Sequence, residues 1–248
     1  MNFLNLKEQY LKNGFFIVRN FFSEEDLGLV LKDIFSQNDV ETYYDKFHNL
    51  RRIEKLYDKS PRLLNLNNQI LLFLEEVLGE EMIIFKDKFN AKPPGAEGFF
   101  AHYDGIFLWD DCNGVKKEGW YEYANDFTNV LIALDESDSS NGTIEVAKKD
   151  DLIFNDLFLN TVQNGTPELT QAVEKARVFN KIDLNIGDVV VFNHKCPHRS
   201  SSNQSNKDRR ILYYTYNKLV DGDHYKRYFS DKKASNPGSK ISKALSKV

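Results

Sequence analysis

Apolar residues in the first third of the chain recur at helical spacing. Residues 4–12 show this pattern before Gly14, and another helix is expected after Ser23, where acidic side chains fill the first turn. A serine N-cap and carboxylates in the first turn both stabilise a helix start. Residues 62–78 repeat the amphipathic pattern, and the apolar segment 15–21 is typical of a strand. The N-terminal part is therefore predicted to be mainly helical.

Beyond residue 80 the pattern changes to short alternating or continuously apolar segments, separated by turns rich in Gly, Pro, Asn and Asp. The predicted strands are residues 81–92, 127–137, 142–147, 181–193 and 210–218. No strand–helix–strand alternation is visible, so a parallel doubly wound sheet is not expected. The order predicts a mainly β protein with N-terminal helices (α+β), whose core is a double-stranded β-helix of the jelly-roll or cupin-like kind.

The charge of the chain is unevenly distributed. The 248 residues carry a formal net charge of −4, yet residues 226–248 contain seven Lys or Arg and one Asp. We expect residues 1–225 to form a single domain and residues 226–248 to form a basic, mobile tail. The alternative for the tail is a lid or a partner contact. The negative balance argues against general nucleic-acid binding.

The chain shows no sign of export or membrane insertion. It has two cysteines, so no disulfide framework is implied. The first residues are too polar for a signal peptide, and no apolar run approaches the length of a membrane span. A cytoplasmic protein with no membrane partner is expected.

The candidate chemistry begins with a His-x-Asp pair. His102 and Asp104 share one face of an extended segment, while Tyr103 points the other way. Alone, such a pair is as well explained by a hydrogen bond at a strand end. His198 lies near another strand end, about ninety residues later. Two imidazoles and one carboxylate on one face of a metal leave the other positions open, which is the donor set of non-haem Fe(II) oxygenases.

The segment around His198 holds further polar groups. His194 and Cys196 share its parity along the chain, so the residues alone leave open which of the three binds metal. Downstream, Arg209 and Arg210 would face opposite sides of a strand. An interior arginine is costly to bury unless it meets an anion. The cosubstrate 2-oxoglutarate, which chelates a metal at one end and presents a carboxylate at the other, would meet that need. A surface arginine pair is the alternative.

Together these motifs resemble the phytanoyl-CoA dioxygenase family of Fe(II)/2-oxoglutarate-dependent oxygenases. The family pattern is His-x-Asp, a distal His-x-Ser and an arginine eleven residues further on, and here it reads "HYD", "HRS" and Arg209. The similarity covers roughly residues 8–218 and includes "NAKPPGAEGFFAHYD" and "LNIGDVVVFNHKCPHRS". The resemblance implies a catalytic Fe(II) bound by three residues and 2-oxoglutarate held by three others. These are His102, Asp104 and His198 for the metal, and Arg209, Ser200 and Asn90 for the cosubstrate.

The resemblance also implies a reaction. A C–H bond of a small polar or anionic metabolite, such as an amino acid or a phosphonate, would be hydroxylated by dioxygen with release of succinate and carbon dioxide. Ascorbate is the expected reductant in vitro. Related halogenases lack the carboxylate ligand, so Asp104 favours hydroxylation. The pattern gives His194 and Cys196 no metal role; we expect them to pack near the site, with Pro197 interrupting the strand before His198.

The substrate residues are less well defined. Lys86 and Lys88 lie on one face of a predicted strand and suggest, with Lys92, Arg51, Arg52 and Lys55, an anionic substrate. An insert at 109–127 is expected to cover the site, with Trp120 and also Tyr103 contacting the substrate. Solvated lysines and packed aromatic rings are the alternatives. The family's Pro-Gly-Ser-His motif is missing, and Lys148 and Lys149 stand in that region.

Two other classes of protein share parts of this pattern. A non-catalytic metal-binding β-barrel, acting as a sensor or binding protein, would use the same metal ligands but would not need an interior arginine. A zinc hydrolase would need a carboxylate base positioned beside the metal. No such base can be identified in the sequence. An oxygenase acting on a small molecule is therefore the favoured prediction.

Overall fold

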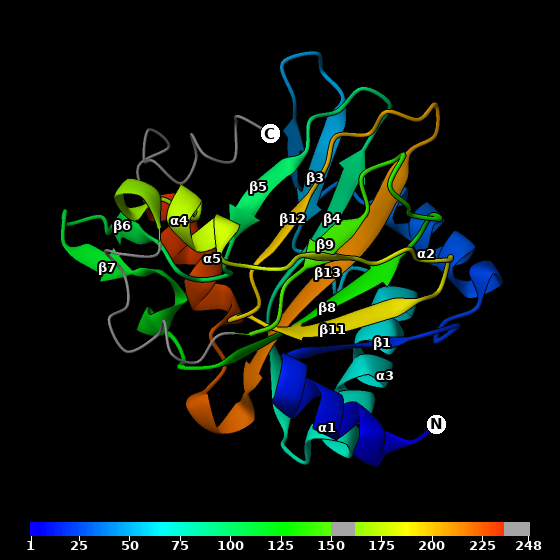
Figure 1. Cartoon of the computed structure of the whole chain (residues 1–248), viewed down its shortest axis with the longest axis horizontal. Coiled ribbons are helices and arrows are strands. Elements are labelled where there is room, and N and C mark those ends of the chain that lie inside the picture. The colour runs from blue at the N-terminus through cyan, green and yellow to red at the C-terminus, as the bar shows by residue number, and fades with distance from the viewer. Residues whose placement is uncertain (150–161, 236–248) are drawn as a thin grey trace.

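The computed structural model describes residues 1–149 and 162–235 (Figure 1). The helices are α1 (Phe3–Asn13), α2 (Glu24–Ser36), α3 (Pro61–Leu78), α4 (Gln171–Lys175) and α5 (Tyr225–Ala234), with short 3-10 turns η1 (Gly119–Glu122), η3 (Gln163–Gly165) and η4 (Leu219–Asp221). The strands are β1 (Phe15–Val18), β2 (Glu41–Tyr44), β3 (Leu50–Glu54), β4 (Met82–Lys92), β5 (Phe99–His102), β6 (Leu108–Asp110), β7 (Lys116–Glu118), β8 (Phe127–Ala133), β9 (Ile144–Val146), β10 (Asn180–Lys181), β11 (Val189–Asn193), β12 (His198–Ser200) and β13 (Arg209–Lys218).

The strands form two main antiparallel sheets. The larger sheet has the order β1-β11-β8-β13-β4-β3-β2, and the smaller has the order β10-β9-β12-β5. Strands β6 and β7 form a separate hairpin. Figure 1 shows α1, α2 and α3 on one side of this assembly and α4, α5 and the hairpin on the other. The expectation of a mainly β jelly-roll core with N-terminal helices is confirmed.

The predicted helix boundaries reflect local capping. Ser23 accepts a hydrogen bond from the backbone N–H of Asp26 at 3.0 Å and begins α2. Gly14 ends α1 in the left-handed region, with φ of 85°, and Gly79 ends α3 in the same way. Glycine adopts this conformation without a steric penalty, so both helices stop where the sequence predicted.

Several elements were not predicted. The hairpin β2–β3 and the short strands β5 and β12 lack a clear alternating pattern.

Helix α5 occupies the first part of the segment 226–248 that was expected to be a tail, and its Phe229 is 4% exposed. The aromatic rings of Tyr225 and Phe229, one helical turn apart, pack together with centroids 5.0 Å apart. Residues 236–248 lie outside the described part of the chain, so mobility there stays a prediction.

Strand β13 separates two layers of the core. Its residues Leu212 and Tyr214 pack with the N-terminal helices, in a cluster that includes buried residues of α2 and α3. The alternate residues Ile211 and Tyr213 pack between the two sheets with Leu131, Val190 and other inward-facing side chains. The period of two along a strand produces this division. The site-facing layer is therefore the one that contains Ile211 and Tyr213.

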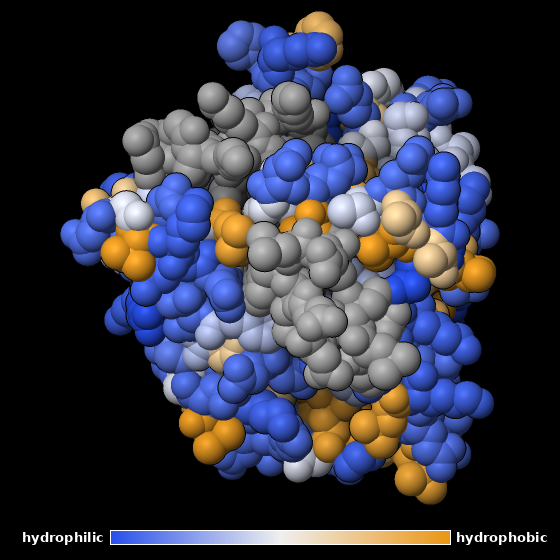
Figure 2. All heavy atoms as spheres, turned by 60° about the vertical axis from the view of Figure 1, so that its left-hand side comes forward, coloured by the Kyte–Doolittle hydropathy of each residue, from blue (hydrophilic) through white to orange (hydrophobic). Residues whose placement is uncertain are grey.

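The outer surface of the described residues is mostly polar. On the face seen in Figure 2, hydrophilic side chains predominate and apolar ones form small separate groups. Among residues 1–149 and 162–235, no helix is both long and apolar enough to cross a membrane.

The turn before β11 ties the N-terminal part to the larger sheet. The buried Asp188 carboxylate accepts hydrogen bonds from the backbone N–H groups of Asn20 and Asn185, both at 2.9 Å, and pairs with Arg19 at 2.6 Å. Gly187 has φ of 86°, and a Cβ there would lie 2.0 Å from the carbonyl oxygen of Phe22. Glycine is required here for both conformation and space.

Replacing Gly187 by alanine is expected to lower the free energy of unfolding by roughly 2–4 kcal/mol, because it combines strain at positive φ with a backbone clash. Chemical denaturation would measure the change. Gly28→Ala is the matched control, since Gly28 lies in α2 with open space around it. That change should raise stability by about 0.5–1 kcal/mol. Equal effects of the two substitutions would contradict the explanation.

Candidate metal centre and adjoining pockets

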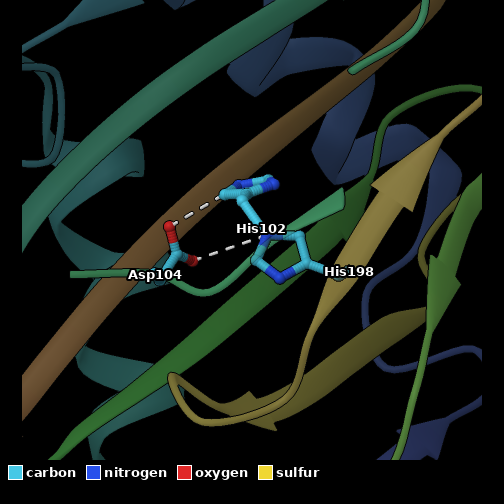
Figure 3. A group of neighbouring side chains, drawn as sticks. All are labelled: His102, Asp104 and His198. Carbon is cyan, nitrogen blue, oxygen red and sulfur yellow. Dashed lines mark ion pairs between the residues drawn. The ribbon is translucent and has the colours of Figure 1, made fainter. Parts of the chain in front are cut away.

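The structure brings His102, Asp104 and His198 together. His102 ends β5, Asp104 follows in the next turn, and His198 begins β12 directly opposite His102 in the antiparallel pairing. Their candidate ligand atoms all lie within 4.8 Å of one another (Figure 3). Nε2 of His102 is 4.0 Å from Oδ1 of Asp104, and Nε2 of His198 is 3.6 Å from Oδ2. All three residues are buried.

Backbone carbonyls orient both imidazoles. Nδ1 of His102 lies 2.9 Å from the carbonyl oxygen of Phe100, and Nδ1 of His198 lies 3.1 Å from that of Cys196. A carbonyl only accepts, so Nδ1 of each ring carries the proton and each Nε2 offers its lone pair to the centre. Burial lowers the pKa of both histidines, which keeps the rings neutral. Neutral imidazoles are the form that binds metal.

Asp104 is held as an anion. Burial would raise the pKa of its carboxyl, but His198, Lys86 and Lys88 together lower it. Two neutral nitrogens and one carboxylate oxygen on one side of a small space match the facial donor set of non-haem Fe(II). The chemistry of the three donors therefore fits a divalent metal ion with positions left open for other ligands.

Tyr213 contacts this centre and was not predicted from the sequence. Its hydroxyl group donates to Oδ2 of Asp104 at 2.9 Å and lies 3.4 Å from Nε2 of His198. Burial and the nearby Asp104 raise the pKa of the phenol, so it remains a donor. The available signal was its parity, because Tyr213 is four residues from Arg209 on the same strand.

One pocket next to the centre contains Arg209. This arginine pocket is lined by His102, His198, Asn90, Ser200, Lys88, Lys92, Arg51, Arg52 and Arg209, among others. Arg209 is 7% exposed, and its Nε has no hydrogen-bond partner among the described residues. Burial, with Arg51 nearby, lowers the pKa of Arg209 to about 10, so the guanidinium stays charged near neutral pH.

Arg210 shows the opposite arrangement. Its Nε and Nη2 donate to the two carboxylate oxygens of Asp135 at 2.7 and 2.6 Å. The sequence expectation that one arginine faces the interior and its neighbour faces outward agrees with this geometry. Only the interior arginine faces the candidate metal centre's pocket.

Lys92 lines the arginine pocket and contacts Ser200. Lys92 of β4 is the residue opposite Arg209 of β13 in the antiparallel register. Its ammonium group donates to Ser200 Oγ at 2.8 Å and to the carbonyl oxygens of Gly142 and Ser201. Burial lowers the pKa of Lys92 to about 6. Three acceptors surround this nitrogen, and only the protonated amine has three hydrogens to donate, so these hydrogen bonds act against the effect of burial. Ser200 keeps its own proton free to donate into the pocket, where Asn90 also lies.

A second pocket on the other side of the centre is rich in aromatic rings. We call it the aromatic chamber; it is lined by Arg52, Glu54, Lys86, Lys88, His102, Tyr103, Asp104, Phe107, Trp109, Trp120, Tyr123, Tyr228 and Lys232, among others. The predicted substrate residues Lys86, Lys88, Tyr103 and Trp120 all line it. Trp109 and Trp120 come from the insert 109–127, which thus forms part of its wall. Arg52, Lys88 and His102 border both pockets.

Lys86 and Lys88 are held mainly by aromatic rings. The Lys86 ammonium lies 3.7 Å from the ring centroid of Trp120, and that of Lys88 lies 4.3 Å from the ring centroid of Tyr213. Neither makes a hydrogen bond or ion pair with another residue in the described ranges. Burial lowers the pKa of both, that of Lys88 to about 8. Lys55, by contrast, pairs with Glu41 at 2.5 Å and lines neither pocket.

The side chains of His194 and Cys196 contact other groups than the candidate metal ligands, in agreement with the expectation that they pack nearby. His194 Nδ1 is 3.3 Å from Asp126, and its Nε2 is 3.0 Å from the Tyr121 hydroxyl group. Cys196 is buried beside the end of α1. Strand β11 ends at Asn193 and β12 starts at His198, so the chain does break around Pro197.

Comparisons with known proteins identify the family. A family model described as Phytanoyl-CoA dioxygenase (PhyH) matches residues 10–211. Two curated relatives are the 2-aminoethylphosphonate dioxygenase of Uncultured bacterium HF130_AEPn_1, 28% identical over 164 residues, and the methylphosphonate hydroxylase of Gimesia maris, 28% identical over 159 residues. The alignments cover 66% and 64% of this chain, and 56% and 54% of the relatives. The chain thus spans about half the length of the curated relatives it matches.

Solved structures share the fold at low identity. EctD from S. alaskensis, solved with 2-oxoglutarate and 5-hydroxyectoine, superposes with a TM-score of 0.66 at 15% identity, covering 88% of this chain and 76% of that one. The non-heme alpha ketoglutarate dependent epimerase SnoN from nogalamycin biosynthesis gives 0.65 at 12% identity, covering 87% and 82%. The family match spans most of the chain, and the protein belongs to the phytanoyl-CoA dioxygenase (PhyH) family.

The aromatic chamber yields a pH prediction. Burial would raise the pKa of Glu54, but Lys232 and Arg52 lower it from 4.5 to about 2. Because the folded-state pKa is depressed, the stabilisation is complete above pH 4.5 and is lost as the pH falls towards 2. Glu54→Gln should be less stable than wild type above pH 4.5, with a difference that shrinks on acidification. Chemical denaturation across this range measures it, with the exposed Glu8→Gln as control; a pH-independent difference would contradict the explanation.

Proposed function

We propose that the protein is an Fe(II)- and 2-oxoglutarate-dependent dioxygenase that hydroxylates a C–H bond of a small polar or anionic metabolite. The observation that carries this proposal is Arg209, a buried guanidinium without an ion pair among the described residues, in a pocket that also contains His102 and His198. A plain metal-binding barrel gives no reason for this costly arrangement. A cosubstrate with a carboxylate remote from the metal explains the arrangement, because that carboxylate would pair with Arg209.

Each residue then has a defined task. His102, Asp104 and His198 would hold Fe(II), which with 2-oxoglutarate and dioxygen supplies the oxidation of a C–H bond, giving an alcohol, succinate and carbon dioxide. Arg209 would pair with the far carboxylate of 2-oxoglutarate, and Ser200 and Asn90 would donate hydrogen bonds to it. The presence of Asp104 favours hydroxylation over halogenation. The aromatic walls around Trp120 would exclude water from the reacting centre.

The nature of the substrate is supported by charge and by the curated relatives. Lys86 and Lys88 present ammonium groups to the aromatic chamber without a carboxylate partner among the described residues. An anionic metabolite would compensate them. The relatives' printed names refer to phosphonates. Phosphonates therefore head the candidates, and other acidic metabolites such as amino acids follow.

The test of the proposed function compares the two adjacent arginines. Purified protein with Fe(II), 2-oxoglutarate and ascorbate is expected to release succinate, and to bind 2-oxoglutarate in calorimetry. Arg209→Met should weaken 2-oxoglutarate binding about a hundredfold, since it removes a buried charge-assisted pair. Arg210→Met should leave binding unchanged, because Arg210 pairs with Asp135. Failure of wild type to bind either iron or 2-oxoglutarate would refute the proposal.

Tyr213 provides a test of the metal site. Removing its hydroxyl group frees the Asp104 carboxylate to rotate, so Tyr213→Phe should lower the affinity for Co(II) or Fe(II) about tenfold or more. Tyr214→Phe is the matched control, because the neighbouring Tyr214 hydroxyl is buried on the other side of β13 and has no hydrogen-bond partner among the described residues. Metal titration of the two variants measures the effect. Equal affinities would show that Tyr213 does not position Asp104.

A further inference from the structure

The aromatic chamber contains more positive than negative charge. Its cationic side chains are Arg52, Lys86, Lys88 and Lys232, and its carboxylates are Glu54 and Asp104. If Asp104 serves the metal, one carboxylate remains for four cations. Even if Lys88, which borders both pockets, is assigned to the cosubstrate, three basic side chains share one carboxylate, and burial lowers the pKa of Lys86, which has no carboxylate partner among the described residues. Unpaired charges in a partly desolvated pocket are costly unless a ligand neutralises them.

The cations approach the chamber from three elements. Lys86 lies on β4 and stacks on Trp120. Arg52 lies on β3 and contacts Glu54 at 3.2 Å, while Lys232 of α5 contacts the other carboxylate oxygen of Glu54. Glu54 thus holds Arg52 and Lys232 on one side of the chamber and leaves Lys86 without a carboxylate partner among the described residues. Such a set can surround one compact anion rather than a chain of separated charges.

Helix α5 is fixed in place as a wall of the chamber. Tyr228 and Lys232 are one turn apart and lie on the same side of the helix. The hydroxyl group of Tyr123 donates to Asp231 at 2.9 Å, and that of Tyr225 donates to the buried Asp87 at 2.6 Å. These contacts tie the helix to the insert and to β4. The family match ends at residue 211, so α5 lies beyond it.

We propose that the aromatic chamber recognises the substrate by a doubly charged oxyanion head group, of the phosphonate or phosphate monoester class, and that α5 supplies part of this head-group site through Lys232. This inference rests on the proposed function, because the chamber is a substrate site only if the protein is the proposed oxygenase. The substrate must then carry two negative charges, and a segment outside the family match takes part in its recognition. Lys86 and Lys232 are the residues that contact the head group, and Trp120 forms the floor beneath it.

The binding test uses an optical property of the chain. Both tryptophans of the protein, Trp109 and Trp120, line the chamber, so tryptophan fluorescence reports on this pocket without metal or turnover. The full chain is titrated with ethylphosphonate and with ethanesulfonate, which has the same shape but a single charge. The phosphonate, at a pH where it is doubly ionised, should bind about tenfold more tightly or better. Equal binding, or no response to either compound, would overturn the proposal.

Adjacent lysines of α5 supply the matched variants. Lys232→Met should weaken ethylphosphonate binding about tenfold or more, whereas Lys233→Met, which removes the same charge from an exposed position, should not change it. Lys232→Arg should retain most of the affinity, which separates loss of charge from damage to the helix. Unchanged binding by Lys232→Met would overturn the role of α5. Phosphonate binding in a protein that does not bind 2-oxoglutarate would refute the proposed function but leave the head-group site standing.

Discussion

The alternation of side chains along β13 is the constraint on which the rest of the molecule depends. This strand lies in the middle of the larger sheet, paired with β8 on one side and β4 on the other. Its outward residues anchor the helical layer, and its inward residues Arg209, Ile211 and Tyr213 line the arginine pocket, where Tyr213 also contacts Asp104. A register slip of one residue would exchange the two sets. The pairing that stabilises the fold therefore also places the site.

The candidate site contains charged side chains whose burial costs stability. Arg209, Lys86 and Lys88 are shielded from bulk water without carboxylate partners in the described ranges, whereas the buried carboxylates Asp87 and Asp188 are each held by several donors. Asp188, for example, is satisfied by two backbone groups and an arginine. Under the proposed function, the contrast separates charges that hold the fold from charges that meet a ligand. It also explains why the metal ligands alone do not define what the pocket accepts.

The sequence predicted those features that depend on local chemistry. Helix ends at Gly14 and Gly79 follow from glycine's freedom at positive φ, and the two-residue spacing of His102 and Asp104 indicated that their side chains lie together, although Asp104 is in the turn after β5. What it did not predict depends on contacts between distant segments. Tyr213 is 109 residues from Asp104 in sequence, and Lys232 is 178 residues from Glu54. The lysines of residues 226–248 suggested a solvated tail. In the structure, Phe229 and Tyr225 anchor α5 to the rest of the protein.

The position of α5 after the family-matching residues has a consequence for the proposed substrate site. The residues proposed for chemistry lie between residues 90 and 209, whereas Lys232 and Tyr228 belong to α5, which lies beyond the family match and lines the chamber. Substitutions in that helix alter the chamber wall without touching the metal ligands or Arg209. Under the proposed function, exchange of this one helix would alter part of the substrate site and leave the residues proposed for the reaction unchanged.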